Sequence, residues 1–212
     1  MTFLECNLAS LASMKQAAET FIRLSEDDYE IQFGTNHLGH ALLICKLLPL
    51  IQATAANADV RIILVTSLGF KFARGIAFAT FCTHQEAIMG KWLRYGQRKL
   101  ASLLYARELA RHYSDLMSIS LTPRVVNTGL VGNLSRFSRA FVWVTNLSQV
   151  LKPEEGVYNH IWVANIPKDC LQNGKFYEPA GVLSSNLGKA AKDEALAKQL
   201  WKSTDEALEL HM

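Results

Sequence analysis

A tyrosine and a lysine stand four residues apart, Tyr95 and Lys99, in the stretch RYGQRKLASLLYARELARHY (94–113). Apolar residues recur in this stretch at helical spacing, and positions i and i+4 lie on the same side of a helix. A phenol beside an ammonium can exchange a proton, because a neighbouring positive charge favours the phenolate. On spacing alone, however, a surface pair on an amphipathic helix explains the two residues better than a catalytic site does.

A serine and a polar loop are expected to lie close to this pair. Ser67 ends the apolar run DVRIILVTS (59–67), which is typical of a strand buried on both faces of a parallel sheet. A second such run, DLMSISLTP (115–123), is followed by TPRVVNT (122–128). Ligands of parallel sheets bind beyond the carboxyl ends of the strands. The sequence therefore predicts that Ser67, Tyr95, Lys99 and the loop after the second strand converge on one crevice.

Strands alternate with helices along the chain, which predicts an α/β fold built on a Rossmann-like open parallel sheet with flanking helices. The 212 residues contain no repeat or low-complexity tract and are expected to form one domain over residues 1–212. The predicted strands are 2–6, 59–67, 115–123 and 174–179, and the predicted helices are 7–24, 25–51, 91–113, 135–151, 152–165 and 193–208.

Composition excludes several classes of function. The net charge is only +3 and the basic residues are scattered, so no nucleic-acid partner is expected. The four cysteines and six histidines show no metal-ligand spacing, which predicts no metal site and a reducing, cytoplasmic compartment. The most apolar region, 37–58, includes Lys46 and Pro49, so a buried helix explains it better than a membrane span.

Several stretches together resemble the short-chain dehydrogenase/reductase family, in particular its retinol-dehydrogenase-like and fungal biosynthetic members. The resemblance spans nearly the whole chain. Tyr-x-x-x-Lys alone is a weak signal, but its combination with an upstream strand ending in Ser and an Asn-x-x-Gly helix is specific. The matching stretches are FGTNHLGHALL (33–43), RIILVTS (61–67), YGQRK (95–99), TPRVVNTGL (122–130) and GKFYEPAG (174–181).

The resemblance implies catalytic roles for four residues. Tyr95 would be the general acid that protonates a carbonyl oxygen, or the general base in the reverse direction. Lys99 would favour the phenolate and bind the nicotinamide ribose, and Ser67 would hold the substrate carbonyl. Asn36 would place a water molecule that links Lys99 to solvent.

The resemblance also implies a nicotinamide dinucleotide cofactor, NADP(H) by analogy, with NAD(H) left open. The cofactor would lie against Asn36, Tyr95 and Lys99. Val126 and Thr128 would line the nicotinamide, and Asn7 would lie near the adenine.

The chain departs from the family pattern in three ways. The Gly-rich T-G-x-x-x-G-x-G turn that receives the cofactor pyrophosphate is not found, so the domain is expected to be N-terminally truncated. The strand that would precede the Asn36 helix is also not found, which would leave an edge of the 59–67 strand unpaired unless residues 2–6 or another chain cover it. Finally, Arg98 replaces a usual Ser, and Arg124 replaces a usual Gly near the nicotinamide, where its side chain would obstruct close approach of a ligand.

Two hypotheses follow. The first is an NADP(H)-dependent oxidoreductase that interconverts a ketone and a secondary alcohol on a small lipophilic or secondary-metabolite substrate. The alternative is a truncated, catalytically inactive relative that acts through protein association, including association with a second copy as a homo-oligomer.

Overall fold

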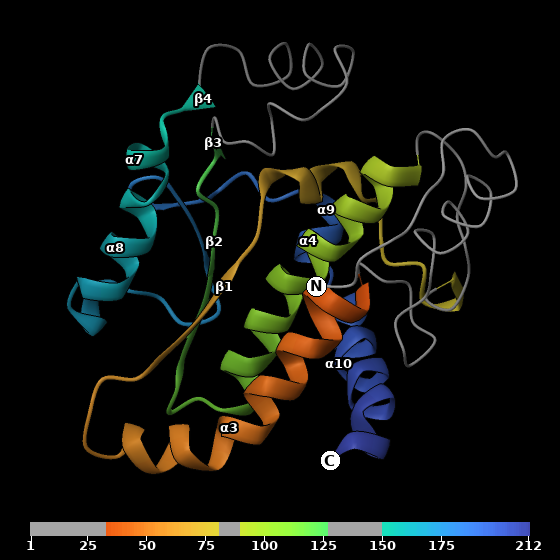
Figure 1. Cartoon of the computed structure of the whole chain (residues 1–212), viewed down its shortest axis with the longest axis horizontal. Helices are drawn as coiled ribbons and strands as arrows, with labels where there is room; N and C mark the ends of the chain where they lie inside the picture. Colours follow the sequence, from red (N-terminus) through yellow and green to blue (C-terminus); the bar gives the residue numbers. More distant parts are fainter. Residues whose placement is uncertain (1–32, 81–89, 127–149) are drawn as a thin grey trace, which may run out of the picture.

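The computed structural model describes residues 33–80, 90–126 and 150–212 (Figure 1). Four strands of this part form one sheet in the order β1-β2-β5-β6: β1 (Arg61–Val65), β2 (Met117–Leu121), β5 (Phe176–Glu178) and β6 (Val182–Leu183). The first three are parallel, with Ile63 opposite Ile119 and Leu121 opposite Tyr177. The α/β prediction is therefore confirmed, with one correction: β6 pairs with β5 in the antiparallel direction.

The central strand β2 is buried on both faces, as its continuous apolar run predicts. Met117, Ile119 and Leu121 pack on one face of the sheet, against Val163 of helix α8 (Tyr158–Asn165). The intervening Ser118 and Ser120 are also fully buried, and their small side chains suit the close packing of helix α4 (Gly90–His112) on β2. The alternation of large and small side chains thus gives the two faces of β2 different partners.

Helices cover both faces of the sheet (Figure 1). The long helix α4 (Gly90–His112) packs on β1 and β2 and contacts α10 (Glu194–Leu208). Helix α10 begins at its N-cap Asp193, whose carboxylate accepts a hydrogen bond of 3.0 Å from the Leu196 amide. The smaller α7 (Pro153–Gly156) and α8 (Tyr158–Asn165) lie in the C-terminal half of the chain. The described part also contains six short helical segments: η1 (Gly34–Leu38), η2 (Leu68–Phe72), η3 (Phe78–Thr80), η4 (Lys168–Cys170), α9 (Lys189–Lys192) and η5 (Glu209–His211).

Two helix predictions need correction. The predicted helix 152–165 is divided at Val157 into α7 and α8. Residues 150 and 151, predicted to end a helix, instead form strand β4 (Val150–Leu151), which pairs in parallel with β3 (Val125–Val126). Strand pairing with a distant segment is a tertiary contact, which local periodicity does not encode. Predicted strand 2–6, predicted helix 7–24 and most of predicted helix 135–151 lie outside the described residues.

Helix α3 (Gly39–Ala55) is less buried than its apolar sequence predicts. Its inward side packs on the core, but Leu43, Leu47 and Leu50 are 57%, 43% and 66% exposed. These three residues recur at helical spacing and form one stripe, which we call the α3 leucine stripe. Gly34–Ala55 is also the candidate for a membrane span among the described residues, by length and composition alone, with 11% of its most apolar window buried. The expectation of a buried helix is therefore wrong for one side of α3.

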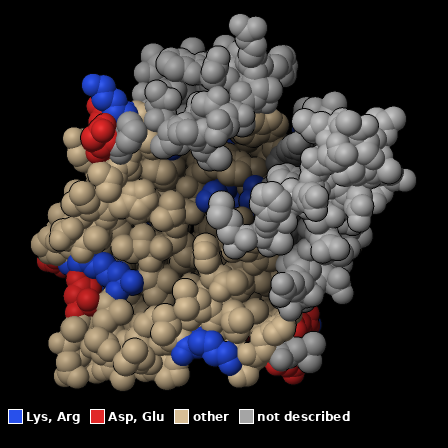
Figure 2. Space-filling model, in the orientation of Figure 1, with Lys and Arg blue, Asp and Glu red and all other residues tan. Residues whose placement is uncertain are grey.

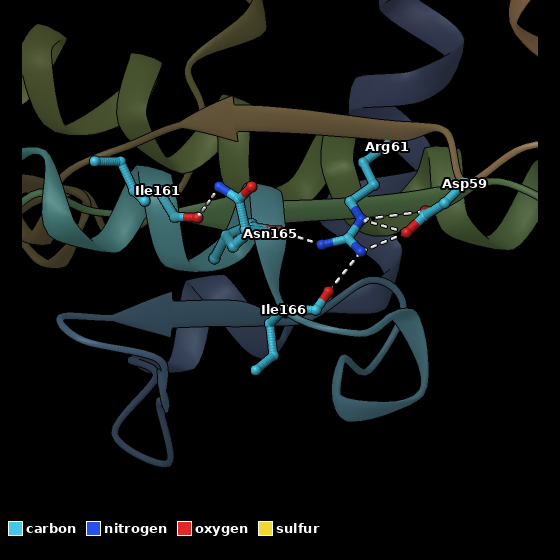
Figure 3. Close-up of polar contacts among 6 residues, drawn as sticks. Asp59, Arg61, Ile161, Asn165 and Ile166 are labelled. Carbon is cyan, nitrogen blue, oxygen red and sulfur yellow. Dashed lines mark hydrogen bonds and ion pairs between the residues drawn. The ribbon is translucent and has the colours of Figure 1, made fainter.

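An arginine joins the start of β1 to the end of α8 (Figure 3). The Arg61 guanidinium donates hydrogen bonds to the carbonyl oxygens of Val163 and Ile166, and it forms an ion pair with Asp59. The last carbonyls of a helix have no partner within the helix and carry partial negative charge, so a cation there is favourable. The hydrogen bonds that Arg61 donates to the Asp59 carboxylate lower the pKa of that carboxyl. Arg61 thus fixes α8 against the sheet.

A buried asparagine holds the carboxyl ends of β2 and β5 together. The Asn159 amide nitrogen donates to the carbonyl oxygens of Thr122 (2.9 Å) and Tyr177 (3.1 Å). Its amide oxygen accepts a hydrogen bond of 3.1 Å from the Gly181 amide. Asn159 is fully buried, so water cannot replace these hydrogen bonds if its side chain is removed.

A buried histidine joins η1 to α4 and α10. The His37 ring packs 4.8 Å from the Phe33 ring and 5.2 Å from the Tyr105 ring, between centroids. His37 Nε2 and Thr204 Oγ1 share a hydrogen bond of 2.8 Å. Burial, with a smaller contribution from His40, lowers the pKa of His37 from 6.5 to about 3. The ring is therefore neutral in the folded protein at neutral pH.

We expect Asn159→Ala to lower the free energy of unfolding by about 2–4 kcal/mol, because it leaves buried backbone groups without partners. Asn165→Ala is the matched control: its side chain is exposed and donates one hydrogen bond to Ile161, so the loss should be below about 0.5 kcal/mol. Urea unfolding of the two variants checks the difference. Equal losses would show that Asn159 does not hold the strands.

We expect His37 to make the fold acid-sensitive. Its folded-state pKa lies below its ordinary value, so its contribution to stability is complete above pH 6.5 and is lost as the pH falls from 6.5 toward 3. Between neutral pH and about pH 5, wild type should lose about 2 kcal/mol more unfolding free energy than His37→Gln does. His211→Gln, which changes an exposed histidine, should behave as wild type. A pH dependence unchanged in His37→Gln would contradict this role.

Candidate active site

Ser67 lies just beyond the carboxyl end of β1, as the sequence predicts. It is the N-cap of η2, and its Oγ accepts a hydrogen bond of 3.2 Å from the Gly69 amide. A serine hydroxyl that accepts one hydrogen bond still has its own proton to donate. Ser67 is therefore held in place by the helix it caps while its O–H can serve a ligand.

Tyr95 lies beside Ser67 because η2 packs closely on α4. A Cβ atom added to Gly69 would lie 2.5 Å from Tyr95 Cε1 and 3.5 Å from Ser67 Oγ. The Tyr95 ring and the Ser67 hydroxyl thus flank the same glycine. The contact continues at Gly96, where an added Cβ would lie 2.9 Å from the Gly69 carbonyl oxygen. Tyr95 occupies the second turn of α4, which begins at Gly90.

Lys99 is tied to the end of β1 at both its backbone and its side chain. Its Nζ donates to the Val65 carbonyl oxygen at 3.2 Å, and its own carbonyl oxygen accepts a 2.6 Å hydrogen bond from Thr66 Oγ1. The ammonium lies 6.0 Å from the centroid of the Tyr95 ring. Burial, and secondarily the charge of Arg98, lowers the pKa of Lys99. This partly desolvated cation interacts more strongly with nearby negative charge than an exposed lysine does.

The remaining predicted site residues are placed less directly. Asn36 lies at the middle of η1, a π-helical segment that packs against α4; such segments are frequent at functional sites. Val126 belongs to β3, beyond the end of β2, and packs on Gly156 at the end of α7. Asn7 and Thr128 lie outside the described residues. The structure therefore brings Ser67, Tyr95 and Lys99 together, and it places Asn36 on a segment in contact with the Lys99 helix.

Two arginines lie near this site: Arg98 is beside Tyr95, and Arg124 is in the loop that follows β2. The Arg98 guanidinium carbon lies 5.3 Å from the centroid of the Tyr95 ring. Arg124 has φ of 64°, the left-handed region, and is the non-glycine residue with this property in the described part. A left-handed backbone conformation raises the energy of a residue that has a Cβ atom, because the Cβ crowds the backbone. Glycine has no Cβ and adopts this conformation without that strain. The glycine expected at position 124 therefore matches the backbone that the structure shows.

Sequence reasoning missed three residues that hold the site together: Thr66, Gly69 and Gly96. Thr66 also joins the strands, because its amide donates to the Leu121 carbonyl oxygen at 2.7 Å. The available signal was the pair of glycines flanking Ser67 and Tyr95 in sequence, since close approach of two backbones requires small residues. Among the described residues no group of three or more metal-ligating side chains comes together.

Figure 2 shows that the described residues on this face are mostly uncharged, and that their lysines and arginines lie in separate groups. Together, a phenol, a hydroxyl and a desolvated ammonium at the carboxyl ends of parallel strands can bind a carbonyl oxygen, give it a proton and stabilise the phenolate that remains.

Comparisons with known proteins identify the class. No family model matches the chain. Human retinol dehydrogenase 14 is 33% identical over 184 residues, covering 84% of this chain and 52% of that protein. An uncharacterized oxidoreductase of Schizosaccharomyces pombe is 29% identical over 241 aligned positions, covering 98% of this chain and 69% of the relative. A short-chain dehydrogenase/reductase of Aspergillus calidoustus is 29% identical, covering 96% of this chain and 69% of that protein.

A solved structure supports the fold. A protein of Mycobacterium paratuberculosis superposes with a TM-score of 0.61 at 24% identity, covering 96% of this chain and 74% of that one. The fold is thus a Rossmann-like α/β fold, and its relatives are named oxidoreductases. The chain is similar in sequence to members of the short-chain dehydrogenase/reductase family and is shorter than the relatives it matches.

We expect Arg124→Gly to be more stable than Arg124→Ala by about 1 kcal/mol, because only glycine adopts this backbone without strain. Both variants remove the guanidinium, so their difference isolates the backbone effect. Urea unfolding of the pair checks the expectation, and equal stabilities would contradict it.

Proposed function

We propose that this chain carries the catalytic half of an NADP(H)-dependent oxidoreductase that interconverts a ketone and a secondary alcohol on a small lipophilic substrate in the cytoplasm. The observation that carries the proposal is the position of Ser67 and Tyr95 on either side of Gly69, with the Lys99 ammonium at the end of β1. The names of the relatives support the reaction class. The choice of NADP(H) over NAD(H) rests on analogy with them.

In the reductive direction, the Ser67 hydroxyl donates a hydrogen bond to the substrate carbonyl oxygen, and the Tyr95 phenol donates its proton to the same oxygen. A bound nicotinamide dinucleotide supplies the hydride. The Lys99 ammonium stabilises the phenolate that forms when Tyr95 gives up its proton. Asn36, on the segment against α4, would hold the water through which the proton is restored.

The donor set at Lys99 fits the nicotinamide-ribose end of such a cofactor. An ammonium has three N–H donors, and the Val65 carbonyl takes one of them. The other two suit the ribose hydroxyls, so the one charge would serve both the cofactor and Tyr95. Val126 and Thr128 would lie along the nicotinamide, and Asn7 near the adenine.

The α3 leucine stripe favours a second candidate function, association through protein contacts. In the described sheet β1 pairs with one strand, β2, which leaves its other edge without a partner there. Leu43, Leu47 and Leu50 add an exposed apolar surface. We infer that a second copy of the chain covers this apolar surface. Replacing the three leucines with Gln should then shift the mass measured by light scattering from dimer to monomer, and a wild-type monomer at all concentrations would reject this candidate.

In any active form of this protein, we expect Tyr95→Phe to reduce ketone-dependent oxidation of NADPH by about 100-fold or more, because Tyr95 is the proton donor of the proposed site. The melting temperature should change little, since the ring is retained. Tyr158→Phe, which alters an exposed tyrosine on α8, is the control and should keep wild-type turnover. Retention of a tenth of wild-type turnover by Tyr95→Phe would refute the assignment.

We expect Lys99→Met to weaken dinucleotide binding by about 10-fold or more and to lower kcat as well, because one ammonium serves the ribose and Tyr95. Lys202→Met, which removes an exposed cation paired with Glu206, should change neither. Fluorescence titration with NADPH gives the affinity, and initial rates give kcat. An unchanged affinity in Lys99→Met would mean that Lys99 does not hold the cofactor.

A further inference from the structure

The aromatic surface at Tyr95 continues beyond the proton donor. The Trp92 ring lies 6.4 Å from the Tyr95 ring, between centroids, at an interplanar angle of 83°. The Phe72 ring lies 6.5 Å from the Trp92 ring at 64°. Edge-to-face contacts of this kind are favourable arrangements of aromatic rings. Three rings from two segments therefore form one continuous row that ends at Tyr95.

Backbone packing holds these rings in register. Trp92 and Tyr95 are three residues apart on α4 and lie on the same side of the helix. Phe72 ends η2, and a Cβ atom added to Gly96 would lie 3.4 Å from Phe72 Cβ. The same close contact of η2 with α4 that places Ser67 beside Tyr95 thus places Phe72 beside Trp92.

The row differs from the aromatic pairs of the core. Phe70, two residues earlier, is buried and packs 5.4 Å from Phe176. Phe72 is 45% exposed, although Phe70, on another side of the same short helix, is buried. Apolar rings exposed beside a few convergent polar groups are the usual composition of a small-molecule site.

We propose that Phe72 and Trp92 form the aromatic wall of the substrate subsite, which selects flat, ring-containing carbonyl compounds over small aliphatic ones. The inference rests on the proposed function, because the carbonyl oxygen of the bound compound lies at Tyr95 and its ring system lies along Trp92 and Phe72. A flat ring system covers both aromatic side chains, whereas a three-carbon ketone reaches Tyr95 without touching Phe72.

The test measures binding of 1-tetralone, a flat bicyclic ketone, and of acetone by saturation-transfer NMR, with the full chain and no turnover required. Trp92→Leu and Phe72→Leu should each weaken 1-tetralone binding about 10-fold and leave acetone binding unchanged. Trp92→Phe should retain most of the affinity, because it keeps an aromatic face. Leu93→Ala, at an exposed neighbouring position on α4, is one control. Trp201→Phe, on α10 against His112 at the far end of α4, is the other, and both variants should bind 1-tetralone as wild type does.

Selective loss in the two leucine variants with rescue by Trp92→Phe supports the subsite. Wild type that does not bind 1-tetralone, leucine variants that bind it normally, or equal weakening in Leu93→Ala would overturn it. Turnover of both ketones is measured separately in the same proteins. Selective binding of 1-tetralone without turnover of either ketone would contradict the oxidoreductase proposal but support the subsite. Turnover of both ketones without selective binding of 1-tetralone would contradict the subsite alone.

Discussion

The close contact between η2 and α4 at Gly69 and Gly96 is the constraint on which the site depends. A side chain at Gly69 would collide with the Tyr95 ring, and one at Gly96 would press on the Gly69 carbonyl oxygen. Because both backbones approach without intervening side chains, the Ser67 hydroxyl reaches the side of α4 that carries Tyr95. A substitution at either glycine would move a polar group of the site, even though neither glycine has a functional group of its own.

The end of β1 fixes the other half of the site through backbone carbonyl groups. Val65 accepts from the Lys99 ammonium, and Thr66 donates to the Lys99 carbonyl. The lysine is thereby held while its charge stays partly out of water, and Arg98 adds a second cation over the Tyr95 ring. Arg98 thus adds positive charge to the site, while Lys99 remains at the end of the strand.

The C-terminal half of the chain supports the strands that carry the site without contributing a described catalytic group. Arg61 binds the last carbonyls of α8, and Asn159 joins the loop after β2 to the end of β5. Both side chains satisfy backbone groups that regular secondary structure leaves open. Arg61 holds the start of β1 against α8, and Asn159 holds the carboxyl ends of β2 and β5 together.

The sequence by itself determined α4, β1, β2, β5 and α10, because helical spacing and continuous apolar runs are local signals. It also determined that Ser67, Tyr95 and Lys99 converge, since a strand end and the i, i+4 rule place them. Tertiary structure alone decided the antiparallel pairing of β6, the pairing of β3 with β4, the break at Val157 and the exposed side of α3. It also decided the row from Tyr95 to Phe72. Each of these depends on which distant segment supplies a hydrogen-bond partner or covers an apolar surface. The spacing of apolar residues along the sequence does not specify that segment.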